Sequence, residues 1–326
     1  MQTSKPALSY KDVYLVPKYS ELDSRGNADT AVELGCRAFK LPVIPSNMKS
    51  LINKTWAKSL AKNDYFYIMH RFNHETVPFV VRANQEDWKT ISISTGVNND
   101  SLEELNTIFK QELRVDYITI DVAHGHHSKV ARRIEYLREK FPKAFIIAGN
   151  VTTPEGVAYL ENAGAHAVKI LIGTGSVCTT RNQTGFSVPS FTAVQWCAEA
   201  ATKPLIADGG INEPGDIAKA LVAGANMVMS GKLFAACKGA ALGPGKLYYG
   251  NASAANKKTS KYIEGTELPV ENVGEYTIEE TLKSLQEALQ SSISYAGGKD
   301  LTCFNHVQWG LYGSQLTQNT TITSTQ

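Results

Sequence analysis

The sequence predicts an α/β fold, a (β/α)8 TIM barrel built as one domain, because short apolar runs alternate with amphipathic segments along its 326 residues. Several runs are apolar throughout, as expected for parallel strands that helices cover. The expected strands lie in eight ranges: 39–48, 65–72, 90–97, 115–125, 144–150, 167–173, 204–210 and 226–231. An open doubly wound sheet is the main alternative, although such a sheet rarely carries so many parallel strands.

An internal repeat supports alternating helices and strands. ENAGAHAVKI (161–170) and LVAGANMVMS (221–230) each read as a helix that ends at Ala-Gly-Ala, followed at once by a strand. Gly164 and Gly224 suit the left-handed position that closes a helix. The helices also begin alike, with a capping residue, a proline and an acid at 153–155 and 212–214.

Composition excludes several classes of protein. Hydrophobic residues make up 43% of the chain and the net charge is +2, with no basic block, so we expect a large core and no nucleic-acid partner. No apolar run is long enough to span a membrane, and the N-terminus has no signal-peptide pattern. The odd, scattered set of cysteines fits free thiols in a reducing cytoplasm. Four of them are interpreted as small core residues: Cys36, Cys197, Cys237 and Cys303.

The boundaries follow from segments outside the repeat. We expect one catalytic domain over 1–316 and a polar, mobile tail over 317–326. Residues 1–30 read as an irregular lead-in. The stretch 243–275 is rich in Gly, Asn, Ser and Lys and follows the eighth expected strand, so it is placed to act as a lid over the active face.

Polar residues and glycines end nearly every expected strand, where TIM barrels hold their active sites. Asp208-Gly209-Gly210 and Ser230-Gly231 follow the seventh and eighth strands, where barrels often bind phosphate on backbone N–H groups. Tight turns are the alternative for these glycines. Ser176 is placed to contact the same phosphate.

Cys178 lies in an unusual loop after the sixth strand, GTGSVCTTRNQTG (173–185). Small residues leave space around its sulfur, and hydroxyl groups stand beside it. As a thiolate, Cys178 would be a strong nucleophile. No histidine is near it in sequence, and a small core residue is the alternative.

This loop, with PLIADGGI and VMSG later in the chain, resembles the IMP dehydrogenase/GMP reductase family, whose loop usually reads GPGSxCTTR around a nucleophilic cysteine. SNM at 46–48, Asp121 and EG at 264–265 fall in the family's order. The resemblance covers roughly 37–300. Thr174 departs from the family, which normally has proline there.

The resemblance extends to the reductase branch of that family. Dehydrogenases usually insert regulatory CBS modules after the second strand, whereas about 20 residues connect the second and third expected strands here. The stretch 250–265 contains no arginine and so lacks the Arg-Tyr pair with which dehydrogenases activate water. The resemblance therefore implies reduction of GMP to IMP and ammonia by NADPH. An IMP dehydrogenase without CBS modules and a non-catalytic nucleotide-binding protein remain alternatives.

The resemblance also implies roles for individual residues. Cys178 is the nucleophile, and Thr180 and Glu264 handle protons on the leaving amine. The substrate-binding set is Met48, Ser176, Asp208, Gly209, Gly210, Ser230, Gly231, Asn251, Ala252, Ser253 and Gly265. The cofactor-binding set is Arg71, Asp121 and Thr180. A monovalent cation such as K⁺ would bind the carbonyls of Gly173, Gly175 and Cys178.

Other family features transfer less directly. Lys261 stands where animal reductases carry arginine, and Arg71 where they carry lysine, so charge is kept but geometry is not. His124, His126 and His127 follow the fourth expected strand without a clear metal-ligand spacing, and we expect them at the solvent or the cofactor. A homotetramer is expected from the resemblance.

Overall fold

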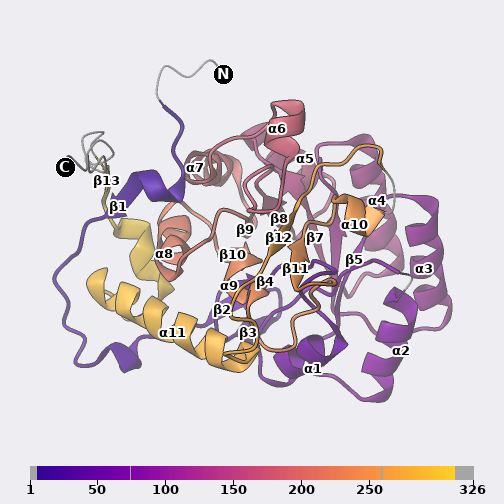
Figure 1. The fold of residues 1–326 in the computed structure, drawn as a ribbon, viewed down its shortest axis with the longest axis horizontal. Coiled ribbons are helices and arrows are strands. Elements are labelled where there is room, and N and C mark those ends of the chain that lie inside the picture. Colours follow the sequence, from indigo (N-terminus) through magenta and orange to yellow (C-terminus); the bar gives the residue numbers. More distant parts are fainter. Residues whose placement is uncertain (1–5, 74, 258–259, 313–326) are drawn as a thin grey trace, which may run out of the picture.

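The computed structural model describes residues 6–73, 75–257 and 260–312, and its centre is a parallel sheet of seven strands (Figure 1). The strands run in the order β4-β10-β9-β8-β7-β6-β5. Their bounds are β4 Val43–Pro45, β5 Ser92–Thr95, β6 Tyr117–Asp121, β7 Phe145–Val151, β8 Ala167–Ile170, β9 Leu205–Asp208 and β10 Met227–Ser230. Because β4 pairs with β10 rather than with β5, the first and last strands of the repeat meet, and the sheet is curled rather than doubly wound.

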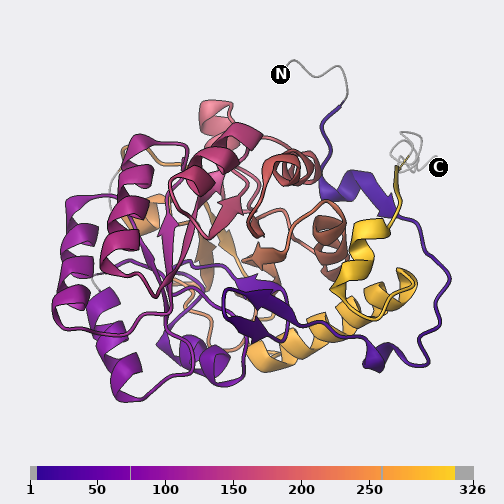
Figure 2. The same ribbon diagram turned by 180° about the vertical axis from the view of Figure 1, so that it is seen from behind.

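Helices alternate with these strands and cover them on the outside (Figures 1 and 2). The main ones are α1 Lys54–Lys62, α2 Thr76–Gln85, α3 Asn99–Lys110, α4 Ser128–Lys140, α5 Pro154–Asn162, α7 Ser190–Ala200, α8 Pro214–Val222 and α11 Ile278–Tyr295. Two are single turns, α6 Thr180–Thr184 and α9 Lys232–Ala235. Continuous burial of the strands explains their unbroken apolar runs.

The repeat is confirmed except at one helix start, because the N-cap of α8 is Glu213 and not the expected Asn212. Thr153 caps α5 by accepting a hydrogen bond from Gly156 N, and proline begins both α5 and α8. Gly164 and Gly224 adopt φ of +105° and +112°, a left-handed conformation that other residues rarely adopt. Each helix therefore ends abruptly and lets the next strand begin within three residues.

The prediction of a strand over 65–72 is borne out only at one point. Met69 forms an isolated parallel bridge with Ile93 of β5, and Ser94 N donates to Met69 O at 3.0 Å. No ladder joins this run to β4 among the described residues. Pro45 is the last residue of β4 and has no N–H to donate. The strand therefore offers one backbone donor fewer to a neighbouring strand.

The amino ends of the strands are closed by a hairpin of β2 Val32–Leu34 and β3 Arg37–Phe39, seen in front of the sheet in Figure 2. Leu34 and Phe39 are buried against the first residues of several strands, including Tyr117 and Met227. The Tyr117 hydroxyl donates to Leu34 O at 2.7 Å. With this end plugged by apolar side chains, only the carboxyl ends of the strands remain for a site.

The first and last described segments of the chain lie together at one side of the sheet (Figure 1). The lead-in contains η1 Tyr10–Asp12, β1 Val13–Leu15 and η2 Arg25–Asn27, and the end contains η3 Leu301–His306 and β13 Trp309–Leu311. β1 pairs antiparallel with β13, so the expected irregular lead-in is partly ordered. The expected tail over 317–326 lies outside the described residues.

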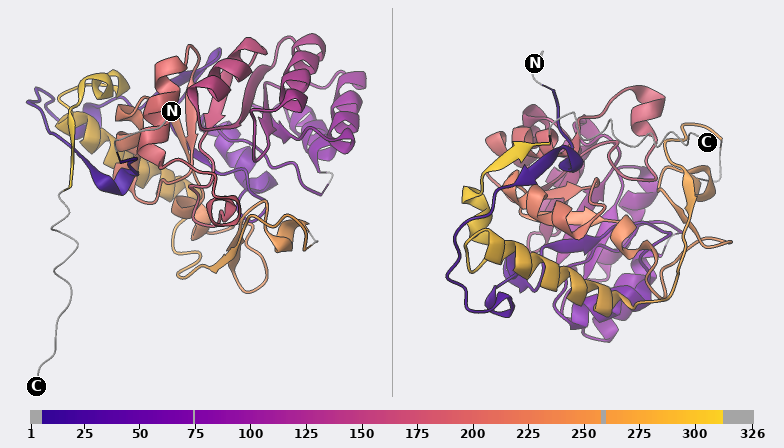
Figure 3. Two further views of the ribbon diagram at one scale, coloured as in Figure 1. Left: turned by 90° about the horizontal axis from the view of Figure 1, so that it is seen from above. Right: turned by 60° about the vertical axis from the view of Figure 1, so that its left-hand side comes forward.

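The 243–275 segment projects from the carboxyl ends of the strands, on the lower side of the left view in Figure 3. It contains β11 Leu247–Tyr249, α10 Ala254–Lys257 and β12 Glu267–Pro269, and β11 pairs antiparallel with β12. In the described part of the chain, no helix is both long and apolar enough to cross a membrane.

The interpretation of the cysteines needs one correction. Cys197 and Cys237 are buried and Cys303 is half-buried, but Cys36 is exposed. Cys36 lies in the turn between β2 and β3, where the short loop of the hairpin leaves its side chain outside the core.

Candidate active site

A cavity of about 520 Å³ opens at the carboxyl ends of the strands, beneath the 243–275 segment. Sixteen of the predicted residues line it, brought together from the carboxyl ends of five strands and the loops after them, from the 65–72 run and from that segment. They are Met48, Arg71, Asp121, Gly173, Gly175, Ser176, Cys178, Thr180, Asp208, Gly209, Gly210, Ser230, Gly231, Asn251, Ala252 and Glu264. Ser253 and Gly265 do not line it.

Ser253 and Gly265 instead hold the wall together. They form a parallel bridge, and an added Cβ at Gly265 would lie 2.7 Å from Ser253 N. Ser253 is fully buried. The two residues therefore fix how the 243–275 segment folds on itself, rather than offering side-chain atoms to the cavity.

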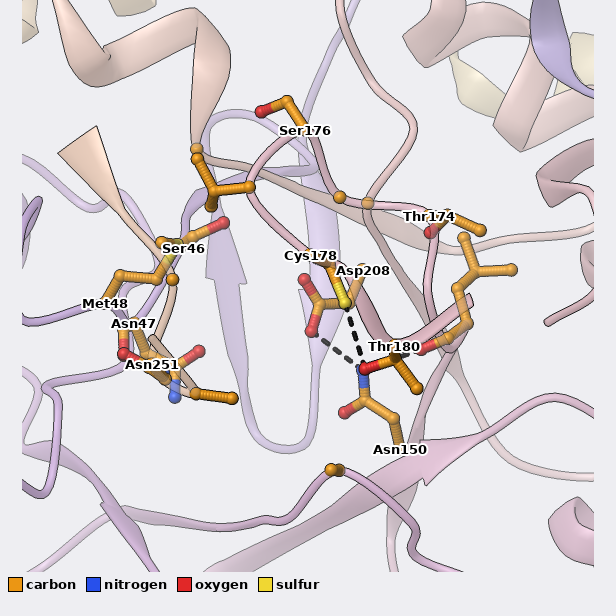
Figure 4. Close-up of a pocket in the computed structure, with 18 of the residues that line it drawn as sticks. Ser46, Asn47, Met48, Asn150, Thr174, Ser176, Cys178, Thr180, Asp208 and Asn251 are labelled. Carbon is orange, nitrogen blue, oxygen red and sulfur yellow. Dashed lines mark hydrogen bonds between the residues drawn. The ribbon is translucent and has the colours of Figure 1, made fainter. Parts of the chain in front are cut away.

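A chain of hydrogen bonds joins the thiol to a carboxylate. Cys178 Sγ donates to Thr180 Oγ1 at 3.3 Å, and Thr180 Oγ1 donates to Glu264 Oε2 at 2.7 Å. Figure 4 shows the Cys178 and Thr180 side chains pointing toward one another. The arrangement links a nucleophile to a proton acceptor through one hydroxyl, which suits general acid–base work at the atom that the sulfur attacks.

Backbone pairing brings Glu264 to this position across 84 residues of sequence. Thr179 N donates to Glu264 O at 2.9 Å, and Thr266 N donates to Val177 O at 2.9 Å. Cys178 and Gly265 form an antiparallel bridge. Backbone hydrogen bonds thus join the cysteine loop and the 243–275 segment as one short antiparallel pair. The position of the Glu264 carboxylate is therefore set by the backbone as well as by side-chain contacts.

A buried ion cluster forms the floor of the cavity. Lys169 of β8 lies between two carboxylates, 2.8 Å from Asp121 at the end of β6 and in direct contact with Asp208 at the end of β9. Asn150 donates to Asp208 at 2.9 Å, as Figure 4 shows, and Asn47 donates to Asp121 at 3.1 Å. Neither acid is left unpaired.

The charges of neighbouring groups favour the ionised forms of Asp121 and Lys169. Burial would raise the pKa of the Asp121 carboxyl, but Lys169 and Arg71 outweigh burial and hold that pKa below its usual range. Burial also opposes the charge on Lys169, yet the two carboxylates raise its pKa above that of an ordinary lysine. At neutral pH the Asp121 carboxylate is therefore ionised and suited to accept hydrogen bonds from hydroxyl or amide groups.

The glycine-rich loops after β9 and β10 lie side by side. Gly209 and Gly210 adopt φ of +120° and +77°, and an added Cβ at Gly209 would lie 2.6 Å from Thr174 Oγ1. The Ser230 hydroxyl donates to Ile211 O at 2.9 Å and so braces one loop against the other. Gly209 N donates to Met229 O at 3.3 Å, and the absence of side chains at these glycines lets a ligand approach the backbone of both loops.

The opposite wall is built by Met48 and the 243–275 segment. The Tyr248 hydroxyl contacts Met48 Sδ at 3.4 Å, and Asn251 donates to Asn47 O at 3.3 Å. In Figure 4, Met48 and Asn251 face Cys178 and Thr180 across the cavity. A flat ligand placed between these walls would have the sulfur at one edge and a thioether with amide groups at the other.

Comparison with known proteins agrees with this geometry. Residues 7–322 match a family model described as the IMP dehydrogenase / GMP reductase domain. The chain belongs to this family. Proteins named GMP reductase share its sequence: those of Enterococcus faecalis (strain ATCC 700802 / V583) and Helicobacter pylori (strain G27) are each 44% identical over 96% of this chain and 98% of their own length. That of Streptococcus pyogenes serotype M4 (strain MGAS10750) is 46% identical over 93% of this chain and 94% of its own.

The structure shows the surroundings of several residues for which the family resemblance gave only weak expectations. The Arg71 guanidinium lies 4.9 Å from the centre of the Phe72 ring at the cavity edge. Lys261 is exposed. His127 caps α4 through Nδ1, which accepts from Lys129 N, and the His126 ring packs on Tyr159. Among the described residues, no group of His, Cys, Asp and Glu side chains could hold a metal ion.

Three residues of the site have no role in the sequence interpretation: Lys169, Asn150 and Tyr248. Lys169 had a visible signal, a single charge inside the apolar run AVKILIG. Asn150 is the last residue of the strand expected over 144–150, and no motif marks it. Tyr248 gave no signal, since one tyrosine in a polar segment is ordinary, and only the tertiary structure places it over the cavity.

Proposed function

We propose that this protein is a GMP reductase, which converts GMP to IMP and ammonia with NADPH as the reductant. The observation that carries the proposal is the Cys178–Thr180–Glu264 chain of hydrogen bonds in a cavity lined by the family's loops. The names of the relatives support it, as does a 250–265 stretch without the arginine of the dehydrogenases. The reaction balances as GMP + NADPH + H⁺ → IMP + NH₃ + NADP⁺.

In the proposed first step, Cys178 forms a bond to C2 of the guanine and the C2–N bond to the exocyclic amine breaks. Thr180, in contact with both the thiol and Glu264, passes the thiol proton toward the departing ammonia. The product is a covalent thioimidate. When bound, NADPH supplies a hydride to C2. The C2–S bond then breaks, IMP forms and the Cys178 thiolate is regenerated.

Binding is assigned to the remaining residues of the cavity. The loops at Gly209, Gly210 and Gly231 hold the phosphate with Ser176 and Ser230, and Asp208 accepts hydrogen bonds from the ribose. Met48, Asn251 and Ala252 pack on the purine, while Asp121 and Arg71 serve the nicotinamide end. Ser253 and Gly265 act as part of the wall, because they lie behind it.

A cation such as K⁺ would bind backbone carbonyls of the cysteine loop. Gly175 O already accepts from Cys178 N at 3.0 Å, and this leaves one of its two lone pairs for a ligand. The residues present therefore fit such an ion through Gly173, Gly175 and Cys178. Its contribution would be to stiffen the loop that carries the thiol.

The wider architecture completes the proposal. The run over 65–72 closes the seven-stranded sheet as an eighth barrel element, with Met69 as its anchor on β5. Residues 1–316 form one catalytic domain, the 243–275 segment acts as a lid, and the protein is a cytoplasmic homotetramer. These assignments rest on the family resemblance.

The test is a direct assay of the purified protein with GMP and NADPH, followed at the absorbance of NADPH. We expect oxidation of NADPH with equimolar formation of IMP and ammonia. The matched reaction with IMP and NAD⁺ separates the alternative, an IMP dehydrogenase without CBS modules. Formation of NADH there, with no oxidation of NADPH by GMP, would contradict the proposal. Binding of GMP without either reaction would indicate a non-catalytic nucleotide-binding protein.

A further inference from the structure

Among the residues that the structure describes, Lys169 is the one side chain with an ion pair to both carboxylates of the cavity floor. It is 1% exposed and lies 2.8 Å from Asp121 on one side, with Asp208 in contact on the other. Asp121 ends β6 and Asp208 ends β9, so a lysine from the intervening β8 ties together strands that are not neighbours in the sheet. Burying a lysine with two carboxylates carries a desolvation penalty that can exceed the attraction between the charges. Stability alone therefore does not account for this cluster.

The neighbouring strand is built to admit this lysine. An added Cβ at Gly149 of β7 would lie 2.3 Å from Lys169 O and 2.7 Å from Lys169 Cβ, so no larger residue fits there. The next residue, Asn150, donates to Asp208 at 2.9 Å and also to Leu171 O at 2.9 Å. Glycine and asparagine at 149–150 thus make room for the lysine and complete the contacts of one of its acids.

Without Lys169, the two acids would be poorly balanced. Asp121 would keep Asn47 and the more distant charge of Arg71, and Asp208 would keep Asn150. Neutral amide donors hold a carboxylate less firmly than a cation does. We therefore expect both carboxylates to change position when the lysine is replaced by an apolar side chain.

We propose that Lys169 is a positioning residue that fixes Asp121 and Asp208 together, and so couples the cofactor end of the cavity to the substrate end. The proposal rests on the function proposed above, in which Asp208 binds the ribose of GMP and Asp121 serves the nicotinamide end. Lys169 acts through the two acids. It makes both binding sites depend on one buried charge.

The experiment compares Lys169→Met and Lys169→Arg with the native protein. Lys219→Met is the control, because Lys219 of α8 is a partly buried lysine that donates to Tyr10 O at 2.9 Å and does not line the cavity. Dissociation constants are measured separately for GMP by calorimetry and for NADPH by its fluorescence. Lys169→Met should weaken both ligands by about tenfold or more, the effect of losing a charged hydrogen bond. Lys169→Arg keeps the charge and should restore part of both affinities together, and Lys219→Met should change neither.

Three outcomes would overturn the inference. In one, Lys169→Met lowers the melting temperature but leaves both dissociation constants unchanged, which would make the lysine purely structural. In another, only one ligand is weakened, which would remove the coupling. If Lys169→Met does not fold, the Lys169→Arg variant decides. The guanidinium of arginine is longer and planar, so it should shift both dissociation constants. Two unchanged dissociation constants would contradict the inference. Failure of the proposed function is distinguishable, because the native protein would then not oxidise NADPH in the presence of GMP, whatever the dissociation constants of the Lys169 variants are.

Discussion

The Tyr248 hydroxyl lies directly over Gly231, so that an added Cβ on that glycine would be 1.7 Å from Tyr248 Oη and 2.8 Å from its Cζ. Gly231 follows β10 in the proposed phosphate loop, and Tyr248 belongs to β11 in the 243–275 segment. Tyr248 is buried, and its hydroxyl also contacts Met48. One aromatic side chain thus joins the phosphate loop, the purine wall and the segment that carries Glu264.

Gly231→Ala should therefore displace Tyr248 and weaken GMP binding by about tenfold, within the usual cost of overpacking. The backbone of Gly231 has φ of −94°, so strain in the backbone itself is not the cause. Gly215→Ala is the matched control, since no atom lies within 4 Å of a Cβ added there. Calorimetry with GMP measures the effect. Equal affinities of Gly231→Ala and Gly215→Ala for GMP would contradict this prediction, because Tyr248 would then move aside freely. The double variant Gly231→Ala/Tyr248→Ala should bind GMP more tightly than Gly231→Ala alone.

Thr180→Val should lower kcat by about 10² to 10⁴, because it removes the hydroxyl that joins Cys178 to Glu264. Valine keeps the shape of threonine, so KM for GMP should change little. Thr179→Val is the control: Thr179 contacts Glu264 only through its backbone N–H, and its side chain makes no capping bond to α6. Steady-state assays with GMP and NADPH give both constants. A Thr180→Val enzyme with native kcat would remove Thr180 from the proton path.

Cys178→Ser should reduce turnover to below about a thousandth of the native value while leaving GMP binding intact, because a serine hydroxyl is a far weaker nucleophile than a thiolate.

In the native protein, GMP should protect Cys178 from alkylation by iodoacetamide. Exposed Cys36 provides an internal control, since its alkylation should not respond to GMP. Mass spectrometry of labelled peptides reads both sites at once. Protection of both thiols or of neither would argue against a purine seated on Cys178.

His70 should make stability depend on pH. Burial, together with Lys49 and Lys54, lowers the pKa of this imidazole from 6.5 to about 4, although Glu75 opposes the shift. The unfolded chain therefore binds a proton more readily than the folded one below about pH 6.5. The free energy of unfolding should fall as the pH drops from about 6.5 to about 4, by up to about 3 kcal/mol from this residue.

His70→Asn tests that origin, because an amide oxygen can replace Nδ1 as the acceptor from Phe72 N. Urea titrations at a series of pH values should show a shallower loss of stability for this variant than for the native protein. His126→Asn is the control on the surface. Parallel pH profiles for the native and His70→Asn proteins would assign the dependence to other groups.

The pattern of strands and helices was predictable because it depends on local sequence. Seven of the expected strands form, and the Ala-Gly-Ala repeat places two helix ends correctly, since glycine is needed wherever φ is positive. The run over 65–72 is as apolar as the others, yet it makes only the Met69 bridge. Pairing depends on the donors and acceptors that a neighbour offers, and Pro45 has no N–H to donate.

The sequence by itself determined the family and predicted the nucleophile and sixteen of the residues that line the cavity, because each of those features resides in a short motif such as GTGSVCTTR. The tertiary structure decided how the pieces meet. It pairs Glu264 with Thr180 across 84 residues, sets Tyr248 over Gly231 and buries Lys169 between two acids. Such relationships arise when strands far apart in the chain end at one edge of a sheet, and a periodic pattern carries no information about side-chain contacts made across that edge.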